Sequence, residues 1–228
     1  MLPRHSRVSC TALLCIMLLG IAGCSSEKNR LQMLVTSCLD VSGETYCNSC
    51  QSPRTESGCV ADNACTRTTE VWRENMYYVA IRDRKMCGCS DPGFIHGLAI
   101  PRAIISGVDA PNRPNGLWSF AWQTALERNI RRSDIALAIN PKHDRSENQM
   151  HIHITRLRDD ARSRITPEMS ARVNDLASVW SVAGKIAAAK GLSDYGVLVT
   201  AGKDGDFMVV VDEDSPEDRF MAARCSKR

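Results

Sequence analysis

The chain has 228 residues, of which 43% are hydrophobic, 24% are charged and 5% are aromatic. This composition is typical of a soluble globular protein and excludes a disordered chain, which would contain fewer apolar residues and more net charge. A formal net charge of +3 is too balanced to indicate a nucleic-acid-binding protein. The length predicts one domain of roughly 150–200 residues with an additional segment.

The first 24 residues have the pattern of a lipoprotein signal. Three basic residues precede an apolar run over 11–22, which is shorter than the about 20 residues that cross a bilayer. The run ends in Ile21-Ala-Gly-Cys24, which resembles a bacterial lipobox. We therefore expect a signal peptide over 1–23, a lipid on Cys24, and a membrane-anchored lipoprotein of the bacterial cell envelope that faces the periplasm. An ordinary signal peptide or an uncleaved anchor is the alternative.

Eleven cysteines are several times the number typical of a cytosolic protein of this length. Two belong to the expected signal peptide and Cys24 to the anchor, which leaves an even number in an exported chain and predicts four disulfides of open connectivity. These cysteines are Cys38, Cys47, Cys50, Cys59, Cys65, Cys87, Cys89 and Cys225. Cys47-Asn-Ser-Cys50 has the spacing of half a zinc ribbon, but without a matching second pair a structural disulfide is favoured.

The rest of the chain alternates short strands and helices. In chain order we predict a tether or short helix over 25–36, a cysteine-rich segment over 37–70, strands over 76–81 and 94–100, a loop over 109–116, a helix over 117–126 capped by Asn115, and strands over 134–140 and 149–155. A helix over 167–190 follows, with Thr166 as its cap and Gly191 at its end, and then a hairpin over 195–211 and a solvated acidic turn over 212–218.

These elements predict an α+β fold, in which helices pack on a mostly antiparallel sheet. We divide the chain into the signal peptide (1–23), a tether with a cysteine-rich segment (24–70) and a catalytic domain (71–228). Trp118, Phe120 and Trp122 recur at helical spacing. Such residues usually form core, although they could also line an access path for acyl chains.

The densest group of titratable residues is on the strand 149–155, where alternation places Gln149, His151, His153 and Thr155 on one face. Two histidines at this spacing allow three interpretations. They could be a solvated pair on an edge strand, or zinc ligands, although no third ligand is visible in the spacing. The third interpretation is a nucleophilic imidazole that attacks phosphorus, which requires a neutral ring oriented by a hydrogen bond.

Several motifs in this order resemble the histidine-triad superfamily, whose motif is three alternating histidines on a strand that follows a strand ending in Asn. The motifs are Gly97-Leu-Ala-Ile-Pro-Arg102, the Trp-bearing helix, Leu137-Ala-Ile-Asn140 and Ser146-Glu-Asn-Gln-Met-His-Ile-His-Ile154. The likeness is greatest to bacterial CDP-diacylglycerol pyrophosphatase, a membrane-tethered branch, and covers about residues 72–225. The cysteine-rich insert at 39–70 and Cys87-Gly-Cys89 depart from it.

The resemblance implies a role for each residue that matches the motif. His151 corresponds to the nucleophile and His153 to the histidine that holds a phosphoryl oxygen, while Asn140 and Ser146 correspond to polar positions on the phosphate side. Gln149 replaces the first histidine, and its amide can hydrogen-bond to phosphate but cannot titrate.

The implied reaction is hydrolysis of CDP-diacylglycerol in the membrane to CMP and phosphatidate through a nucleotidyl-histidine, with no cofactor, metal or nucleic acid. Two alternatives remain at this point. The chain could be an exported histidine-triad hydrolase of soluble nucleotide conjugates, or a catalytically inactive envelope lipoprotein in which Gln149 marks a decayed site.

Overall fold

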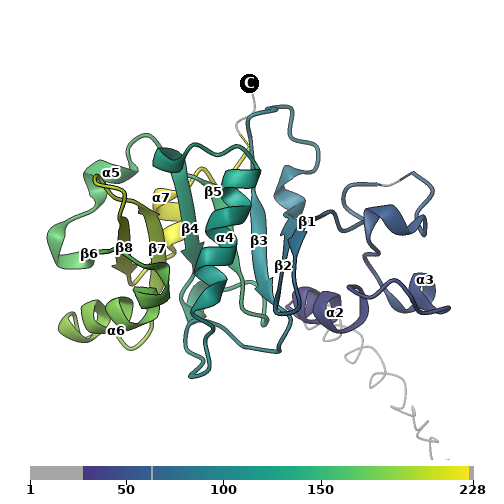
Figure 1. The fold of residues 1–228 in the computed structure, drawn as a ribbon, viewed down its shortest axis with the longest axis horizontal. Helices are drawn as coiled ribbons and strands as arrows, with labels where there is room; N and C mark the ends of the chain where they lie inside the picture. Colours follow the sequence, from purple (N-terminus) through teal and green to yellow (C-terminus); the bar gives the residue numbers. More distant parts are fainter. Residues whose placement is uncertain (1–27, 63, 226–228) are drawn as a thin grey trace, which may run out of the picture.

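The computed structural model describes residues 28–62 and 64–225, so that the expected signal peptide and Cys24 lie outside the described residues (Figure 1). The strands are β1 (Val71–Glu74), β2 (Tyr78–Arg82), β3 (Gly97–Pro101), β4 (Ile135–Ile139), β5 (Ile152–Arg156), β6 (Ser170–Val173), β7 (Gly196–Ala201) and β8 (Phe207–Asp212). The helices are α2 (Arg30–Ser37), α3 (Tyr46–Ser49), α4 (Gly116–Glu127), α5 (Ala161–Arg164), α6 (Val179–Ala189) and α7 (Pro216–Phe220).

The strands form one eight-stranded sheet in the order β1-β2-β3-β5-β4-β7-β8-β6, and all of its pairings are antiparallel. The central strands β3, β4 and β7 are buried along their whole length, as expected for apolar runs that are covered on both faces. The predicted α+β fold with an antiparallel sheet is confirmed.

One face of the sheet packs against α4 and α6. Alternate side chains of the central strands, including Leu137 and Ile152, form the main core with Trp118 and Trp122 of α4. Both tryptophans are almost completely buried, at 0% and 2% exposed, and Trp118 contacts the Trp180 ring of α6. These aromatic residues are therefore core and do not line an open path for acyl chains.

The other face is covered at two places by short helices. Leu31 and Leu34 of α2 pack on β2 and β3, and Phe220 of α7 packs on β4 and β7. The central strand β5 runs between β3 and β4, so its side chains on this face lie between the two helices. This arrangement places the alternating histidines in a buried gap between α2 and α7.

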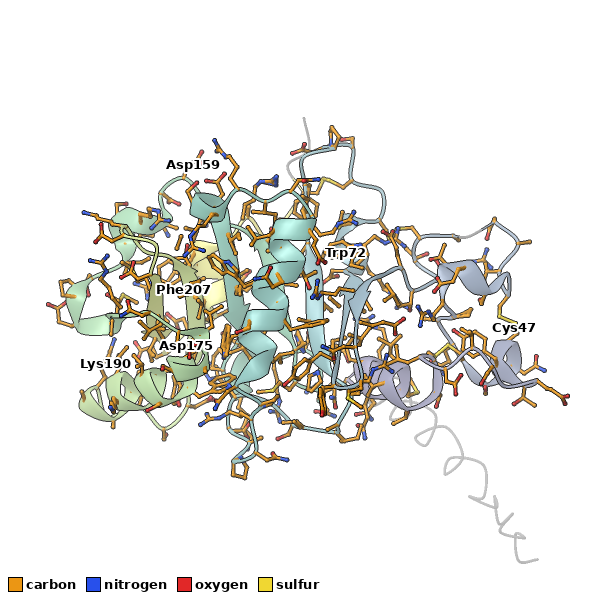
Figure 2. All side chains as sticks on the ribbon, viewed as in Figure 1. Cys47, Trp72, Asp159, Asp175, Lys190 and Phe207 are labelled. Atoms are coloured by element: carbon orange, nitrogen blue, oxygen red, sulfur yellow. A yellow bond between two sulfur atoms is a disulfide. The ribbon has the colours of Figure 1, made fainter. Side chains whose placement is uncertain are left out.

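Four disulfides join the eight expected cysteines: Cys38–Cys50, Cys47–Cys59, Cys65–Cys87 and Cys89–Cys225. The predicted number is confirmed. Cys47 and Cys50 each pair with a different cysteine, so their spacing does not mark a zinc site. Figure 2 shows Cys47 at the edge of the molecule, in the segment that the first two disulfides hold together.

The predicted helix over 167–190 is wrong in its first half. Pro167–Met169 is a single 3-10 turn, Ser170–Val173 is β6, and α6 begins only at Val179. Residues 170–173 pair with β8, whose backbone groups on that side would otherwise lack partners. Gly191 follows the end of the helix with a φ of 69°, as predicted.

Two further expectations are corrected. Asn115 precedes α4 but its side chain makes no capping hydrogen bond. The acidic stretch 212–218 is not a solvated turn, because Pro216 begins α7 and Ser215 caps it by accepting a hydrogen bond from the Asp218 N–H. Asp212 and Glu217 are buried. No helix of residues 28–62 or 64–225 is long and apolar enough to cross a membrane.

Candidate active site

His151 lies directly before β5, at the end of the sheet where β3 and β4 finish. His151 is 8% exposed, and its Nδ1–H donates to the main-chain carbonyl of Gln149 over 2.8 Å. This bond leaves the Nε2 lone pair free of a proton. Burial lowers the pKa of His151, so the ring is neutral at pH 7. A neutral, oriented imidazole is the form that can act as a nucleophile.

His153 follows on the same strand face, and its ring centroid is 4.8 Å from that of His151. The ring is buried, and Nε2 lies 3.2 Å from Glu217 Oε2. Burial lowers the pKa of His153 to about 3, against the opposing attraction of Glu217. The pair therefore enters the site as two neutral rings, which removes the interpretation of a solvated pair on an edge strand.

A third histidine, His96, completes this cluster. It lies just before β3 and is fully buried, with its ring 5.4 Å from that of His153. Its Nδ1 is 3.1 Å from Asp83 Oδ2, and its Nε2 shares a hydrogen bond with Glu217 Oε1 over 3.2 Å. Burial alone would lower the pKa of His96, but the two carboxylates outweigh it and raise the pKa.

Glu217 connects His96 and His153 to the C-terminal helix. Burial would raise the pKa of Glu217, but the neighbouring histidines and the Lys85 ammonium hold it well below its usual range. The carboxylate contacts Lys85 Nζ and accepts a hydrogen bond from Asn140 Nδ2 over 3.0 Å. It is therefore a buried anion between cationic and neutral partners.

Four residues of this cluster were not predicted from the sequence, namely Asp83, Lys85, His96 and Glu217. The only local signal for His96 was a histidine inside the apolar stretch 94–100, and the Ser215-Pro216 pair at the start of α7 was a helix-start signal within the acidic stretch. Neither signal indicates contact with the histidines of β5. His96 and Glu217 are 121 residues apart in sequence, and only the fold brings them together.

Asn140 and Ser146 line the space next to this cluster. A pocket of about 490 Å³ is bordered by Lys85, Asn140 and Ser146, among others, and Asn140 also borders the small recess in front of His151. The Asn140 side chain is itself held, because its Oδ1 accepts a hydrogen bond from Ser215 Oγ over 3.0 Å. Asn140 thus joins the two hollows and fixes the start of α7.

Gln149 lies on the same face, but its side chain is engaged by the loop after β3. Its Nε2 donates to the carbonyls of Pro101 and Ala103 over 2.9 and 2.8 Å, and its Oε1 accepts from the N–H of Ile105 over 3.4 Å. The amide therefore holds the loop that walls the His151 recess. Its main-chain carbonyl orients His151.

Glu147 connects the site to the N-terminal helix. This buried carboxylate accepts hydrogen bonds from Arg30 Nε and from the N–H of Leu31 in the first turn of α2, over 3.0 and 3.1 Å. The next residue, Asn148, donates its N–H to the carbonyl of Lys28 over 2.6 Å. The segment before His151 is therefore attached to the point where the described chain begins.

Three of the buried groups have the ligand types of a metal site. Atoms of Asp83, His96 and His153 lie within 4.8 Å of one another. In this arrangement, however, His96 is already paired with the one carboxylate of the group, Asp83, over 3.1 Å, and the raised pKa of His96 favours the imidazolium form, which cannot bind a metal. The negative charge of Asp83 is therefore balanced by the proton on His96.

The antiparallel sheet with packed helices defines an α+β protein. At one end of this sheet, the neutral imidazole of His151 forms a candidate site for nucleophilic attack. A family model, CDP-diacylglycerol pyrophosphatase, matches residues 59–190. The chain belongs to this family, which is a family of hydrolases. The match includes His96, His151 and His153, whereas Glu217 lies after its end. Membership implies CDP-diacylglycerol pyrophosphatase activity.

Proposed function

We propose that the chain hydrolyses CDP-diacylglycerol to CMP and phosphatidate through a covalent cytidylyl intermediate on His151. The observation that carries this mechanism is the hydrogen bond from His151 Nδ1–H to the carbonyl of Gln149, combined with burial that keeps the ring neutral. The alternation of His151 and His153 on a central strand supports the resemblance to the histidine-triad superfamily, in which the middle position of the motif is the nucleophile.

In the first step, Nε2 of His151 attacks the phosphorus of the CMP moiety. The nitrogen–phosphorus bond forms while the bond from that phosphorus to the bridging oxygen breaks. The electron pair leaves with phosphatidate, a phosphomonoester that is stable as an anion. Because Nδ1 keeps its proton, the ring becomes cationic, and the carbonyl of Gln149 stabilises that charge.

In the second step, water attacks the same phosphorus and the nitrogen–phosphorus bond breaks, which releases CMP and restores neutral His151. The neutral His153 is beside His151 and can accept the proton of the attacking water, which it releases to solvent when CMP leaves, so that both rings are neutral again. Glu217 then faces an imidazolium at 3.2 Å, which favours this transient charge.

Asn140, Ser146 and Lys85 border the adjacent pocket, where we place the phosphoryl oxygens and the leaving phosphate. The diphosphate carries negative charge, so the Lys85 ammonium and the Arg224 guanidinium at the pocket wall favour its binding, against the carboxylates of Asp144, Glu217 and Asp218 that border the same pocket. The side chain of Gln149 supports the loop over 101–105 and does not take part in this contact.

The expected location is also part of the proposal. A substrate with two acyl chains stays in the bilayer, and a lipid on Cys24 would raise its effective concentration at the site. We propose a signal peptide over 1–23, a tether and cysteine-rich segment over 24–70, and a catalytic domain over 71–228 in the cell envelope, facing the periplasm. Metabolic palmitate labelling that is unchanged in Cys24→Ser would contradict this anchor.

The nucleophile is tested with His151→Asn, which keeps a polar side chain of similar size but cannot form the intermediate. We expect release of CMP from CDP-diacylglycerol in mixed micelles to fall by at least about 10³-fold. Quenching without acid should trap labelled cytidylyl-protein in the parent and not in the variant. The matched control is His143→Asn, since His143 is 53% exposed and is paired with Asp194. Near-parental turnover in His151→Asn would refute the mechanism.

A further inference from the structure

Three of the largest exposed apolar side chains in the described chain gather at one place. Met76 and Tyr77 form the turn between β1 and β2 and are 77% and 64% exposed, and Ile104, in the loop after β3, is 51% exposed. The two loops are joined, because Arg102 donates its N–H to the carbonyl of Tyr77 over 2.9 Å. We refer to Met76, Tyr77 and Ile104 as the apolar tip.

The apolar tip is at the same end of the sheet as His151. Tyr78 is paired with Pro101, and Ala99 with Ile152, so that the start of β2, the end of β3 and the start of β5 are neighbours. The loop that carries Ile104 is also held from the active-site side, because Gln149 donates to the carbonyl of Ala103. The tip therefore projects from the wall of the catalytic recess.

The N-terminal segment reaches the molecule at this end as well. The carbonyl of Lys28 accepts the hydrogen bond from Asn148, three residues before His151, and Asn148 Nδ2 donates to Asn29 Oδ1 over 2.7 Å. Figure 1 shows α2 and the turn between β1 and β2 at the same lower edge of the molecule. Lys28 is four positions after Cys24, and a chain of that length spans at most about 14 Å.

We infer that the apolar tip inserts into the surface of the lipid bilayer and turns the catalytic recess toward the lipid headgroups. This inference rests on the proposed function. The scissile diphosphate of CDP-diacylglycerol is attached to the glycerol at the headgroup level, so His151 must come to the membrane surface to reach it. An apolar tip beside the recess satisfies this requirement, and inserting it removes apolar surface from water.

The tip and the N-terminal segment give two points of attachment on one side of the molecule. A tether alone would raise the local concentration of enzyme but would leave its orientation free. Contact of the apolar tip with the bilayer supplies a second point of attachment and fixes the orientation. Tyrosine in particular favours the membrane interface. The apolar tip therefore raises the rate of hydrolysis of substrate in the bilayer and does not change the chemical step.

Insertion is measured directly by the fluorescence of Tyr77→Trp in the full chain, mixed with phosphatidylcholine vesicles that contain brominated acyl chains. We expect quenching of the added tryptophan relative to the parent protein. The matched control is Leu126→Trp, because Leu126 is 37% exposed and apolar but lies in the last turn of α4, which begins beside Tyr78. Leu126 is therefore about 15 Å along α4 from Gly116, the end of the helix that lies beside Tyr78.

Activity provides the second arm. In the variant Met76→Ser/Tyr77→Ser/Ile104→Ser, hydrolysis of vesicle-bound CDP-diacylglycerol should fall by at least ~10-fold, because the apolar area that would be buried in lipid is lost. Hydrolysis of water-soluble CDP-dibutanoylglycerol should stay within about twofold of the parent, since the tip does not touch the reacting atoms. Leu126→Ser should match the parent on both substrates.

Each outcome separates the inference from the function on which it rests. The docking inference is overturned if the tryptophan at position 77 is not quenched, or if the triple variant matches the parent on vesicles. In either case, activity on the soluble substrate leaves the proposed function intact. A parent protein inactive on both substrates overturns the function. A dimer that forms without lipid and dissociates in the triple variant would assign the tip to a second copy of the chain and overturn membrane docking.

Discussion

The buried carboxylate of Glu217 offers a quantitative test of the histidine cluster, through the substitution Glu217→Gln. Glu217 is 5% exposed and 3.2 Å from His96 Nε2, which is held as an imidazolium by its raised pKa. A unit charge pair at this distance interacts by about 5 kcal/mol at an effective dielectric constant of about 20. Part of this loss is offset, because glutamine does not carry the desolvation cost of a buried carboxylate.

We therefore expect Glu217→Gln to lower the free energy of unfolding by about 3 kcal/mol at pH 5.5, as in other buried pairs that lose one partner. For a chain of this length, that loss corresponds to a decrease in Tm of about 6–12 °C. The measurement is urea unfolding with the disulfides intact, and the control is Glu213→Gln, because Glu213 is exposed. The control should differ from the parent by less than about 0.5 kcal/mol.

The pH dependence distinguishes a charged pair from simple packing. The folded pKa of Glu217 is lowered, so its contribution is present above its ordinary value of 4.5 and is lost as the pH falls through the folded pKa. The folded pKa of His96 is raised, so its contribution is present below 6.5 and is lost as the pH rises through the folded pKa. The effect of Glu217→Gln should therefore be largest between about pH 4.5 and 6.5 and smaller at alkaline pH.

The residual effect at alkaline pH should come from Lys85, which is 44% exposed and therefore contributes little. If Glu217→Gln costs less than about 1 kcal/mol at pH 5.5, Glu217 does not act as a paired buried anion. If the cost is the same at pH 5.5 and pH 9.5, His96 is not an imidazolium in the folded protein, and the electrostatic account of the cluster is wrong.

Three further predictions concern other parts of the molecule. His153→Asn should lower kcat by about 10²–10³-fold while labelled cytidylyl-protein still forms; a parental kcat would remove His153 from the mechanism. Gln149→Glu should destabilise the protein by about 2–4 kcal/mol in urea unfolding, because a carboxylate would face the carbonyls of Pro101 and Ala103; unchanged stability would show that the amide does not hold the loop. Alkylation under denaturing, non-reducing conditions should modify no cysteine between Cys38 and Cys225, whereas reduction should expose eight thiols there; two reactive thiols before reduction would contradict the fourth disulfide.

Local patterns in the sequence were sufficient for much of the fold. The two-residue period of Gln149 to Thr155 predicted the strand and the shared face of His151 and His153, because side chains alternate along any strand. The even number of cysteines in the expected mature chain likewise predicted four disulfides. It could not predict their partners, because the pairing of Cys89 with Cys225 spans 136 residues.

Helical propensity gave a wrong prediction over residues 170–173, where pairing with a distant strand decides the structure. Residues 170–173 form a strand because the outer side of β8 offers backbone hydrogen bonds, and local sequence contains no information about that open edge. The acidic stretch near the C-terminus was expected in water because charged residues are usually exposed. Burial of Glu217 is stable only because distant parts of the chain supply Lys85, His96 and Asn140 as its partners.

The candidate site divides in the same way. The alternation of residues 149–155 is enough to predict which histidines share a strand face, since that depends on the geometry of one strand. The protonation of these histidines follows from the fold, because the pKa of each ring depends on burial and on charges from other elements. His151 and His153 are neutral since the sheet and the helices remove them from water, whereas His96, buried as deeply, favours its proton because Asp83 and Glu217 flank it.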